Sequence, residues 1–486
     1  MNENPIETQL LNLIDLLNGL VWGNVLIYVL LISGAFFTIA TGFVQFRYFG
    51  HMLSNFKNSR NTSGGISPFQ AFCTGLAARV GTGNLAGVAV AIVLGGPGAV
   101  FWMWLVAIIG MATSFVESTL AQTFKVKNED GSSRGGPAYY IQQGLGSRTW
   151  GIVFALCLMI SFGFAFNGVQ ANSISDALEL AFDIPDWVSG IFITLATAIV
   201  IWGGTKRVAV FVEYVVPVMA LAYILIALIV VLLNIADLPA AVSNIVSSAL
   251  GFQEAGAGAL GAAMMNGIKR GLFSNEAGMG SAANAAATAN PNPHHPATQG
   301  FFQMFGVFVD TIVICTCTAA IILLFDGYED SKLTGIQLTQ VALSSHLGDW
   351  SGTFLAIVIT FFAFTSIVAN YSYAESNLKF ITEDNLRLQV YRLILLAVVM
   401  YGSIGSLPLV WNFADLTMGV MALVNLVALC LLFKYVRVIF KDYQEQHARG
   451  ELPVFEKSLY PEIAKKIDDD VWSETREEVH AKNPPL

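Results

Sequence analysis

Long apolar stretches alternate with short polar ones along almost the whole chain. A helix that crosses a lipid bilayer needs about 20 predominantly apolar residues, and we identify eleven stretches of roughly this length. They cover residues 24–46, 68–95, 99–124, 150–182, 187–203, 208–234, 257–289, 300–325, 352–381, 389–407 and 409–433. The pattern predicts an all-α, polytopic membrane protein with eleven transmembrane helices.

The polar segments are expected to lie outside the bilayer. Residues 1–23 contain acidic residues but no Lys or Arg, so they lack the basic start of a cleavable signal peptide. We expect a short interfacial helix there. The polar segment between the eighth and ninth spans should hold a short helix at residues 334–347. From Lys434 onward the chain becomes charged, which predicts a solvated tail over residues 434–486.

Composition agrees with this picture. Of the 486 residues, 55% are hydrophobic and 12% are charged, and the mean hydropathy is +0.62, whereas soluble domains carry about 25% charged residues. All five cysteines lie in apolar segments, without the spacings of zinc sites or disulfide frameworks. The lipid bilayer is therefore the expected environment, and we expect no cofactor and no nucleic-acid partner.

The distribution of basic residues predicts the orientation. If the N-terminus lies outside, 21 of the 25 Lys and Arg residues fall in cytoplasmic segments or at the cytoplasmic ends of spans, and one falls in an outer segment. The remaining three lie deeper within predicted spans. Basic residues concentrate on the cytoplasmic side of membrane proteins, so the sequence predicts an outer N-terminus and a cytoplasmic tail.

Two predicted spans are interrupted by glycine and polar residues. The second span is interrupted between Gly75 and Gly87, and the seventh carries Ser274-Asn275-Glu276 followed by Gly278 and Gly280. Irregular backbone at membrane depth is tolerated only where it is buried in protein or lines a cavity. Glycine also allows close helix packing, which would be the better explanation of one isolated span. Two such spans favour a binding site.

The two breaks occupy corresponding positions in two halves of the chain. Once the extra helix at residues 24–46 is set aside, the other ten spans divide into five-helix repeats at residues 67–235 and 255–433. Each repeat opens with a broken helix, and the two repeats have opposite orientations. This arrangement indicates an inverted-repeat transporter with its site near the bilayer midplane.

The breaks suggest a substrate class. Backbone N–H groups at the start of a half-helix suit a carboxylate, while freed carbonyls and the oxygens of Asn, Ser and Thr suit a hard cation such as Na⁺. An amino acid together with Na⁺ satisfies both requirements.

Three long motifs then occur in order: GTGNLAGVAVAIVLGGPGAVFWMW at residues 81–104, GLFSNEAGMGSAANAAA at 271–287 and HPATQG at 295–300. Through these motifs the chain resembles the sodium:alanine symporter family, also called alanine or glycine:cation symporters. The resemblance covers essentially the whole chain before the tail. The resemblance implies a LeuT-type fold of ten core helices plus one in front, in the cell membrane of a prokaryote. It also implies import of a small neutral amino acid, of the alanine or glycine class, with Na⁺ as the coupling ion. Glutamine as substrate and H⁺ coupling remain alternatives.

The expected site residues follow from the breaks, from polar residues within spans and from this resemblance. The expected substrate-binding residues are Thr82, Gly83, Asn84, Asn167, Gln170, Phe273, Ser274 and Asn275. The expected Na⁺ ligands are Val80, Asn84, Thr365 and Ser366. The resemblance implies the amide roles of Thr82 and Gly83 and the second sodium site at Thr365-Ser366. Packing hydrogen bonds remain the alternative for the polar side chains, and a core position the alternative for Phe273.

Charged residues inside the predicted spans need partners, because an unpaired charge there is costly. Four of them flank the breaks: Arg79, Lys269, Arg270 and Glu276. Their possible partners on other spans are Glu117, Asp310, Glu375 and Asp415. We expect most of these residues to form ion pairs that hold the broken helices. An outer gate between Arg270 or Lys269 and Asp415 is a further hypothesis.

Two other functional classes are less consistent with the sequence. A membrane-embedded enzyme would need a nucleophile or metal motif, and the zinc motif HExxH does not occur in the sequence. An ion channel would not need two asymmetric broken helices.

Overall fold

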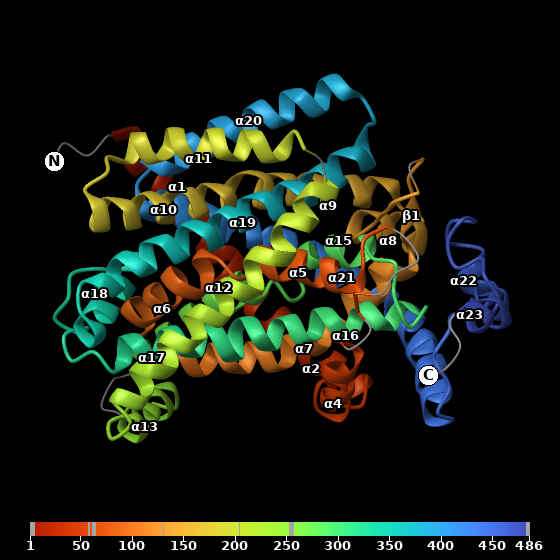
Figure 1. Cartoon of the computed structure of the whole chain (residues 1–486), viewed down its shortest axis with the longest axis horizontal. Coiled ribbons are helices and arrows are strands. Elements are labelled where there is room, and N and C mark those ends of the chain that lie inside the picture. The colour runs from red at the N-terminus through yellow and green to blue at the C-terminus, as the bar shows by residue number, and fades with distance from the viewer. Residues whose placement is uncertain are drawn as a thin grey trace.

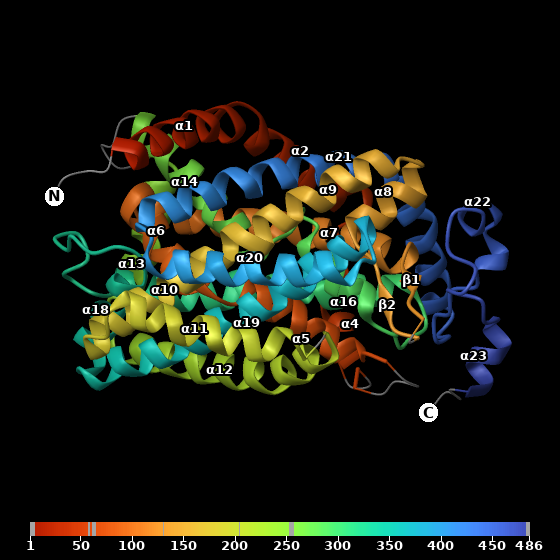
Figure 2. The ribbon, with the colours of Figure 1, turned by 90° about the horizontal axis from the view of Figure 1, so that it is seen from above.

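The computed structural model describes residues 5–56, 59–60, 65–129, 131–203, 205–251 and 257–482. Most of the long helices run along one common axis and form a bundle (Figure 1). The short helices α13 (Leu238–Ala249) and α18 (Gly335–Leu347) lie at one end of this axis. The C-terminal helices α22 (Pro461–Ala464) and α23 (Arg476–Lys482) lie at the opposite end, as Figure 2 also shows. We call this second end the tail side.

The first half of the chain begins with α1 (Pro5–Val21), which lies along the outside of the bundle (Figure 2). Its other elements are, in order, η1 (Trp22–Leu26), α2 (Ile27–Ala40), α3 (Val44–Arg47), α4 (Phe49–Asn55), α5 (Pro68–Arg79), η3 (Gly83–Gly87), α6 (Val88–Gly95), α7 (Gly98–Thr123), β1 (Val126–Lys127), β2 (Ser133–Arg134), α8 (Pro137–Leu145), α9 (Arg148–Ile160), η4 (Ser161–Phe166), α10 (Asn167–Phe182), α11 (Asp186–Ile201) and α12 (Thr205–Leu233). The strands β1 and β2 form one short antiparallel hairpin.

The second half follows α13 in the same bundle and includes α18, between α17 and α19. Its remaining elements are α14 (Ala257–Asn275), α15 (Ser281–Thr288), α16 (Pro296–Val307), η5 (Phe308–Cys315), α17 (Thr316–Leu323), α19 (Trp350–Ile381), α20 (Asn385–Ile404), α21 (Leu407–Ala448) and η6 (Lys457–Leu459). Of these segments η5 is π-helical, as are η1, η3 and η4 in the first half.

The structure supports a multi-pass membrane protein but not the predicted number of spans. Among the described residues, seven helical stretches are long and apolar enough to cross a membrane, and the bent pair formed by α5 and η3–α6 makes an eighth. Three predicted spans are not among them, because α2 and α11 have only 14 and 16 residues and the seventh span divides into α14 and α15. The count of eleven is therefore not confirmed.

The C-terminal region differs from the prediction. The last apolar stretch was expected to end at residue 433, but α21 continues to Ala448. Its continuation buries Tyr435, Val436, Ile439, Phe440 and Tyr443, and this spacing places them on one face of the helix. The tail was expected to be solvated, but Phe455 and Trp472 are buried. The many charged residues of the tail predict a solvated segment, but a few aromatic side chains anchor it to the bundle.

The first break has a clear local cause. Ser67 and Gln70 form a capping box at the start of α5, with Pro68 in the first helical turn. The helix ends at Arg79, because Val80 adopts an extended conformation with φ −77° and ψ 92°. The chain then resumes as η3 and α6, bent by 45° relative to α5.

Candidate functional site

The first break presents backbone amides to the polar side chains around it. Gln170 on α10 accepts two hydrogen bonds from Thr82 through its Oε1 atom, one from the backbone N at 3.0 Å and one from Oγ1 at 2.7 Å. The Gly81 amide donates to Asn84 Oδ1 at 3.0 Å. On α19, Ser366 Oγ donates to the carbonyl of Ala77 at 2.7 Å. The break thus joins α5, α10 and α19.

The second break is a loop of five residues between α14 and α15. Its backbone has positive φ angles at Glu276 (58°), Gly278 (91°) and Gly280 (83°), a conformation that costs glycine little but is uncommon for other residues. Glu117 on α7 holds this loop, because its Oε2 accepts from the amides of Gly278 at 3.2 Å and Gly280 at 3.1 Å. The same oxygen accepts from Asn425 Nδ2 at 3.2 Å.

The two broken helices meet at a buried carboxylate. Asn84 Nδ2 in the first break donates to Ser274 Oγ at 3.2 Å, close to the end of α14. Both side chains also donate to Asp310 on η5, Asn84 to Oδ1 and Ser274 to Oδ2, each at 2.6 Å. Thr311 Oγ1 donates to Asp310 Oδ2 at the same distance. All four side chains are fully buried.

An aromatic stack lies beside this polar cluster. Phe273 packs between two rings, Phe166 with centroids 4.3 Å apart and Trp411 with centroids 5.0 Å apart. The ring of Phe273 also lies against Gly83, where an added Cβ would be 3.0 Å from Phe273 Cδ1. The stack therefore closes over the backbone of the first break and leaves little room there.

Some of the charged residues around the breaks form the ion pairs that the sequence suggested, and others have different partners. Arg270 Nη2 forms an ion pair with Asp415 Oδ2, and Lys269 Nζ lies 4.0 Å from the same oxygen. The Arg270 guanidinium also lies 4.7 Å from the ring centroid of Trp411. Arg79 instead donates to the carbonyl of Gln303 at 3.1 Å and to Ser114 Oγ at 3.2 Å.

Several predicted site residues come together at the breaks. The hydrogen bonds and contacts described above connect Thr82, Gly83, Asn84, Gln170, Phe273, Ser274 and Ser366. Three other predicted residues have hydrogen bonds outside this group. Thr365 Oγ1 donates to the carbonyl of Phe362 on its own helix at 2.8 Å, Asn167 Oδ1 accepts from Asn370 Nδ2 at 3.0 Å, and the Val80 amide donates to the Leu76 carbonyl at 2.7 Å.

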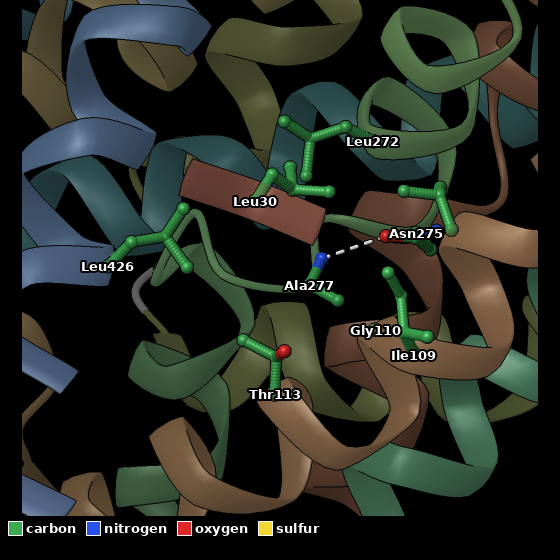
Figure 3. A pocket seen from close by; sticks show the side chains of 9 residues that line it. Leu30, Ile109, Gly110, Thr113, Leu272, Asn275, Ala277 and Leu426 are labelled. Atoms are coloured by element: carbon green, nitrogen blue, oxygen red, sulfur yellow. Dashed lines mark hydrogen bonds between the residues drawn. The ribbon is translucent and has the colours of Figure 1, made fainter. Parts of the chain in front are cut away.

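Asn275 lines a small cavity, together with Ala277 and Thr113 (Figure 3). Its Oδ1 accepts from the Ala277 amide at 2.9 Å, and among the described residues its Nδ2 has no hydrogen-bond partner. The cavity is otherwise mainly apolar, with Leu30, Leu272 and Leu426 in its wall. This geometry favours a role for Asn275 in shaping the loop.

Sequence reasoning missed the centre of the cluster. Asp310 was considered only as an ion-pair partner, and Phe166 and Trp411 were not singled out. A signal existed for Asp310, since an ionisable residue inside a span is by default a functional-site candidate. Three π-helical segments also adjoin the cluster, η3 at Asn84, η4 at Phe166 and η5 at Asp310. Such segments are frequent at functional sites, but the sequence alone gave no sign of them.

Comparison with known proteins places this geometry in context. The model of the sodium:alanine symporter family matches residues 7–457. The probable sodium/glutamine symporter GlnT of Bacillus subtilis is 47% identical over 97% of this chain and 98% of its own length. The sodium/alanine symporter AgcS of Methanococcus maripaludis is 40% identical over 89% of this chain and 97% of its own length.

A solved structure supports the predicted fold. The structure of MhsT in complex with L-phenylalanine matches with a TM-score of 0.53 at 14% sequence identity, and the match covers 75% of this chain and 89% of that one. At this identity the likeness concerns the fold alone, which is the LeuT-type transporter fold expected from the sequence. The prediction that the chain is not an enzyme is also confirmed, because a family model that covers most of the chain shows that it belongs to the sodium:alanine symporter family of membrane transporters.

Proposed function

We propose that this chain imports a small neutral amino acid of the alanine or glycine class together with Na⁺ by alternating access. The observation that carries the proposal is the contact between the two broken helices, where Asn84, Ser274 and Asp310 form one buried cluster. Its carboxylate and neutral oxygens are the ligands that a hard cation prefers. We therefore assign the coupling Na⁺ to this cluster, with Asp310 added to the predicted ligands.

The substrate is proposed to bind next to this cation, against the backbone of the first break. Thr82 and Gly83 supply the amides for its carboxylate, and Gln170 orients Thr82. The Phe273 ring beside Gly83 limits the space for a side chain, which supports a substrate the size of alanine or glycine. Glutamine, which the name of GlnT suggests for that relative, would require Phe273 to move.

The conformation is consistent with a carrier whose site is closed on both sides. Thr82, Asn84 and Ser274 are all fully buried. Arg270, Asp415 and Trp411 close the site from the side opposite the tail, and we propose that they form the outer gate. The distribution of Lys and Arg supports a cytoplasmic tail and an outer N-terminus in a prokaryotic cell membrane. The division into residues 1–23, 24–46, 67–235, 255–433 and 434–486 remains a prediction.

Uptake into proteoliposomes tests the proposal. An inward Na⁺ gradient should drive accumulation of labelled alanine against its own gradient, which an ion channel cannot do. Unlabelled alanine, glycine, serine and glutamine would be compared as competitors. If alanine accumulation depends on a pH gradient and does not depend on Na⁺, the coupling ion is H⁺ and the Na⁺ assignment is wrong.

The cation assignment has its own test. Asp310→Asn keeps the shape of the side chain but removes its charge, and we expect it to weaken the apparent Na⁺ affinity by about 100-fold, as removal of a charged ligand does when it contributes about 3 kcal/mol. Glu329→Gln, a change at an exposed acidic residue, serves as the control. An unchanged Na⁺ affinity in Asp310→Asn would remove Asp310 from the ion site.

A further inference from the structure

The two broken helices are tied to each other at the tail side of the bundle. Ile66, just before α5, and Ala289, just after α15, form an isolated parallel bridge. The amide of Asn290 donates to the Ile66 carbonyl at 2.9 Å. The carbonyl of Ala289 accepts from Lys125 Nζ at 2.9 Å and from Gln122 Nε2 at 3.0 Å, both from the end of α7 and the residues after it. We call these five residues the end tie.

The C-terminal tail folds back onto this end tie. The indole Nε1 of Trp472 donates to the carbonyl of Gln122 at 3.1 Å, and Lys125 Nζ lies 4.9 Å from the centroid of the same ring. The Trp472 side chain is 3% exposed. One tail residue therefore contacts both residues that hold Ala289, Gln122 at the end of α7 and Lys125 just after it.

Further contacts anchor the tail beside the end tie. The amide of Phe455 donates to the carbonyl of His294 at 2.9 Å, in the loop that follows α15. Arg476 Nη2 donates to Asp442 Oδ1 at 2.7 Å, which connects the tail to α21. Lys466 Nζ donates to the carbonyl of Gly144 at 2.9 Å. A cavity of about 800 Å³ separates part of the tail from the bundle, with Lys125, His294 and Trp472 in its wall.

We propose that the tail is a latch that holds the tail side of the transporter closed. Alternating access requires the two repeats to separate at each side in turn, and on the tail side this separation must break the bridge between Ile66 and Ala289. While Trp472 is docked, opening also has to disrupt its contacts with Gln122 and Lys125. The tail thus stabilises the closed tail side and slows release of substrate there.

The latch residues lie outside the part of the chain that the family model matches. The family model ends at residue 457, so Trp472 and Arg476 lie beyond it. The inference rests on the proposed alternating-access function, because it assigns the tail a role in one of its two openings. A partner or modification that removes the tail from the end tie would speed transport.

Thiol labelling of the full-length protein tests the latch without any substrate. Ala289→Cys reports on the end tie, and Ala285→Cys, one turn deeper on α15, reports on separation of the helices; both alanines are buried. A membrane-impermeant maleimide is applied from the tail side, and peptide mass spectrometry measures the rate at each position. Trp472→Ala should raise both rates by about tenfold, the shift expected when one state loses the contacts that favour it.

Matched variants keep this test decisive. Leu459→Ala changes an exposed tail residue that is 51% accessible and should leave both rates unchanged. Arg476→Ala loosens the tail away from the end tie and should act in the same direction as Trp472→Ala, even if the latter folds poorly. Unchanged labelling rates in both variants would overturn the latch proposal. Faster labelling at position 289 without a change at position 285 would also overturn it, because the tail would then only shield Ala289 and would not hold the helices together. Because labelling requires neither amino acid nor Na⁺, failure of the transport proposal would be seen separately in the uptake assay.

Discussion

The two broken helices satisfy their freed backbone amides in different ways. In the first break the chain leaves the helix for only a few residues, and side chains such as Gln170 and Asn84 satisfy the freed amides. In the second break the loop is longer, contains three positive φ angles and is held by the carboxylate of Glu117. The side chains that accept the freed amides of the first break are neutral, whereas a buried carboxylate accepts those of the second.

This difference suggests that the first break binds ligand and that the second supports the fold. A backbone amide can exchange a neutral acceptor such as Gln170 Oε1 for a ligand carboxylate at moderate cost, since each neutral hydrogen bond contributes only about 1 kcal/mol net. A buried carboxylate that accepts three hydrogen bonds is harder to displace, because the charge would then be left unsatisfied. We therefore expect the first break to be sensitive to small steric changes and the second to the loss of Glu117.

The largest effect is expected at the second break. Glu117→Ala leaves the amides of Gly278 and Gly280 and the Nδ2 group of Asn425 without their acceptor. The expected loss of stability is about 3 kcal/mol, since each buried unsatisfied donor costs roughly 1–3 kcal/mol. Thermal unfolding in detergent measures it, with Glu117→Gln as the control that keeps an acceptor oxygen and should lose less. Equal unfolding midpoints for wild type and Glu117→Ala would contradict the supporting role.

A smaller effect is expected at the first break. In Gly81→Ala the new Cβ would meet Ser366 Oγ and lie 2.8 Å from Gln170 Oε1, so these side chains must shift. We expect alanine uptake to fall about tenfold, equivalent to about 1.4 kcal/mol, with little loss of stability. Gly87→Ala is the matched control, because its nearest contact, to Trp411, is an ordinary 3.5 Å. If both variants transport equally well, the first break is not the binding region.

The smallest effect is expected from Asn275, although the sequence placed it in the substrate site. Asn275→Ala removes the hydrogen bond to the Ala277 amide and widens the small cavity of Figure 3. The cost should be about 1 kcal/mol of stability, and the apparent affinity for alanine should stay within about twofold, since the described hydrogen bond of this side chain is to the loop amide of Ala277. A tenfold weaker affinity for alanine would return Asn275 to the substrate site.

Much of the fold was predictable because bilayer physics simplifies the sequence. Long apolar stretches located the helical regions, and the glycine and polar interruptions located both breaks. The ends of helices were harder to predict, as the extension of α21 to Ala448 illustrates, because burial of one amphipathic face continues a helix after the fully apolar stretch ends. The hairpin of β1 and β2 lies in a polar segment, and the apolar helix α13 has only 12 residues, too few to be recognised as a span.

The candidate site was predictable where the backbone itself is unusual and less so elsewhere. Residues within the breaks, such as Asn84 and Ser274, were found because irregular backbone at membrane depth is rare. Asp310 was not, because it lies in an apparently regular span and its importance depends on which helices pack around it. Thr365 and Ser366 are adjacent in sequence, yet only Ser366 has a hydrogen bond to the first broken helix, since neighbouring residues on a helix point about 100° apart.

The π-helical segments make the direction of the site side chains depend on the exact number of residues in each segment. Each π turn closes its hydrogen bonds over five residues instead of four, so it holds one more residue than the same length of regular helix. Deletion of one residue from η5 would therefore return this turn to regular α-helix and leave the flanking helix on both sides in register. The change would be confined to the π-helical segment that carries Asp310, whose direction relative to Asn84 would then differ. Relatives should accordingly keep these segments at constant length even where their residues differ, and a single-residue gap there in an alignment would mark a rebuilt site.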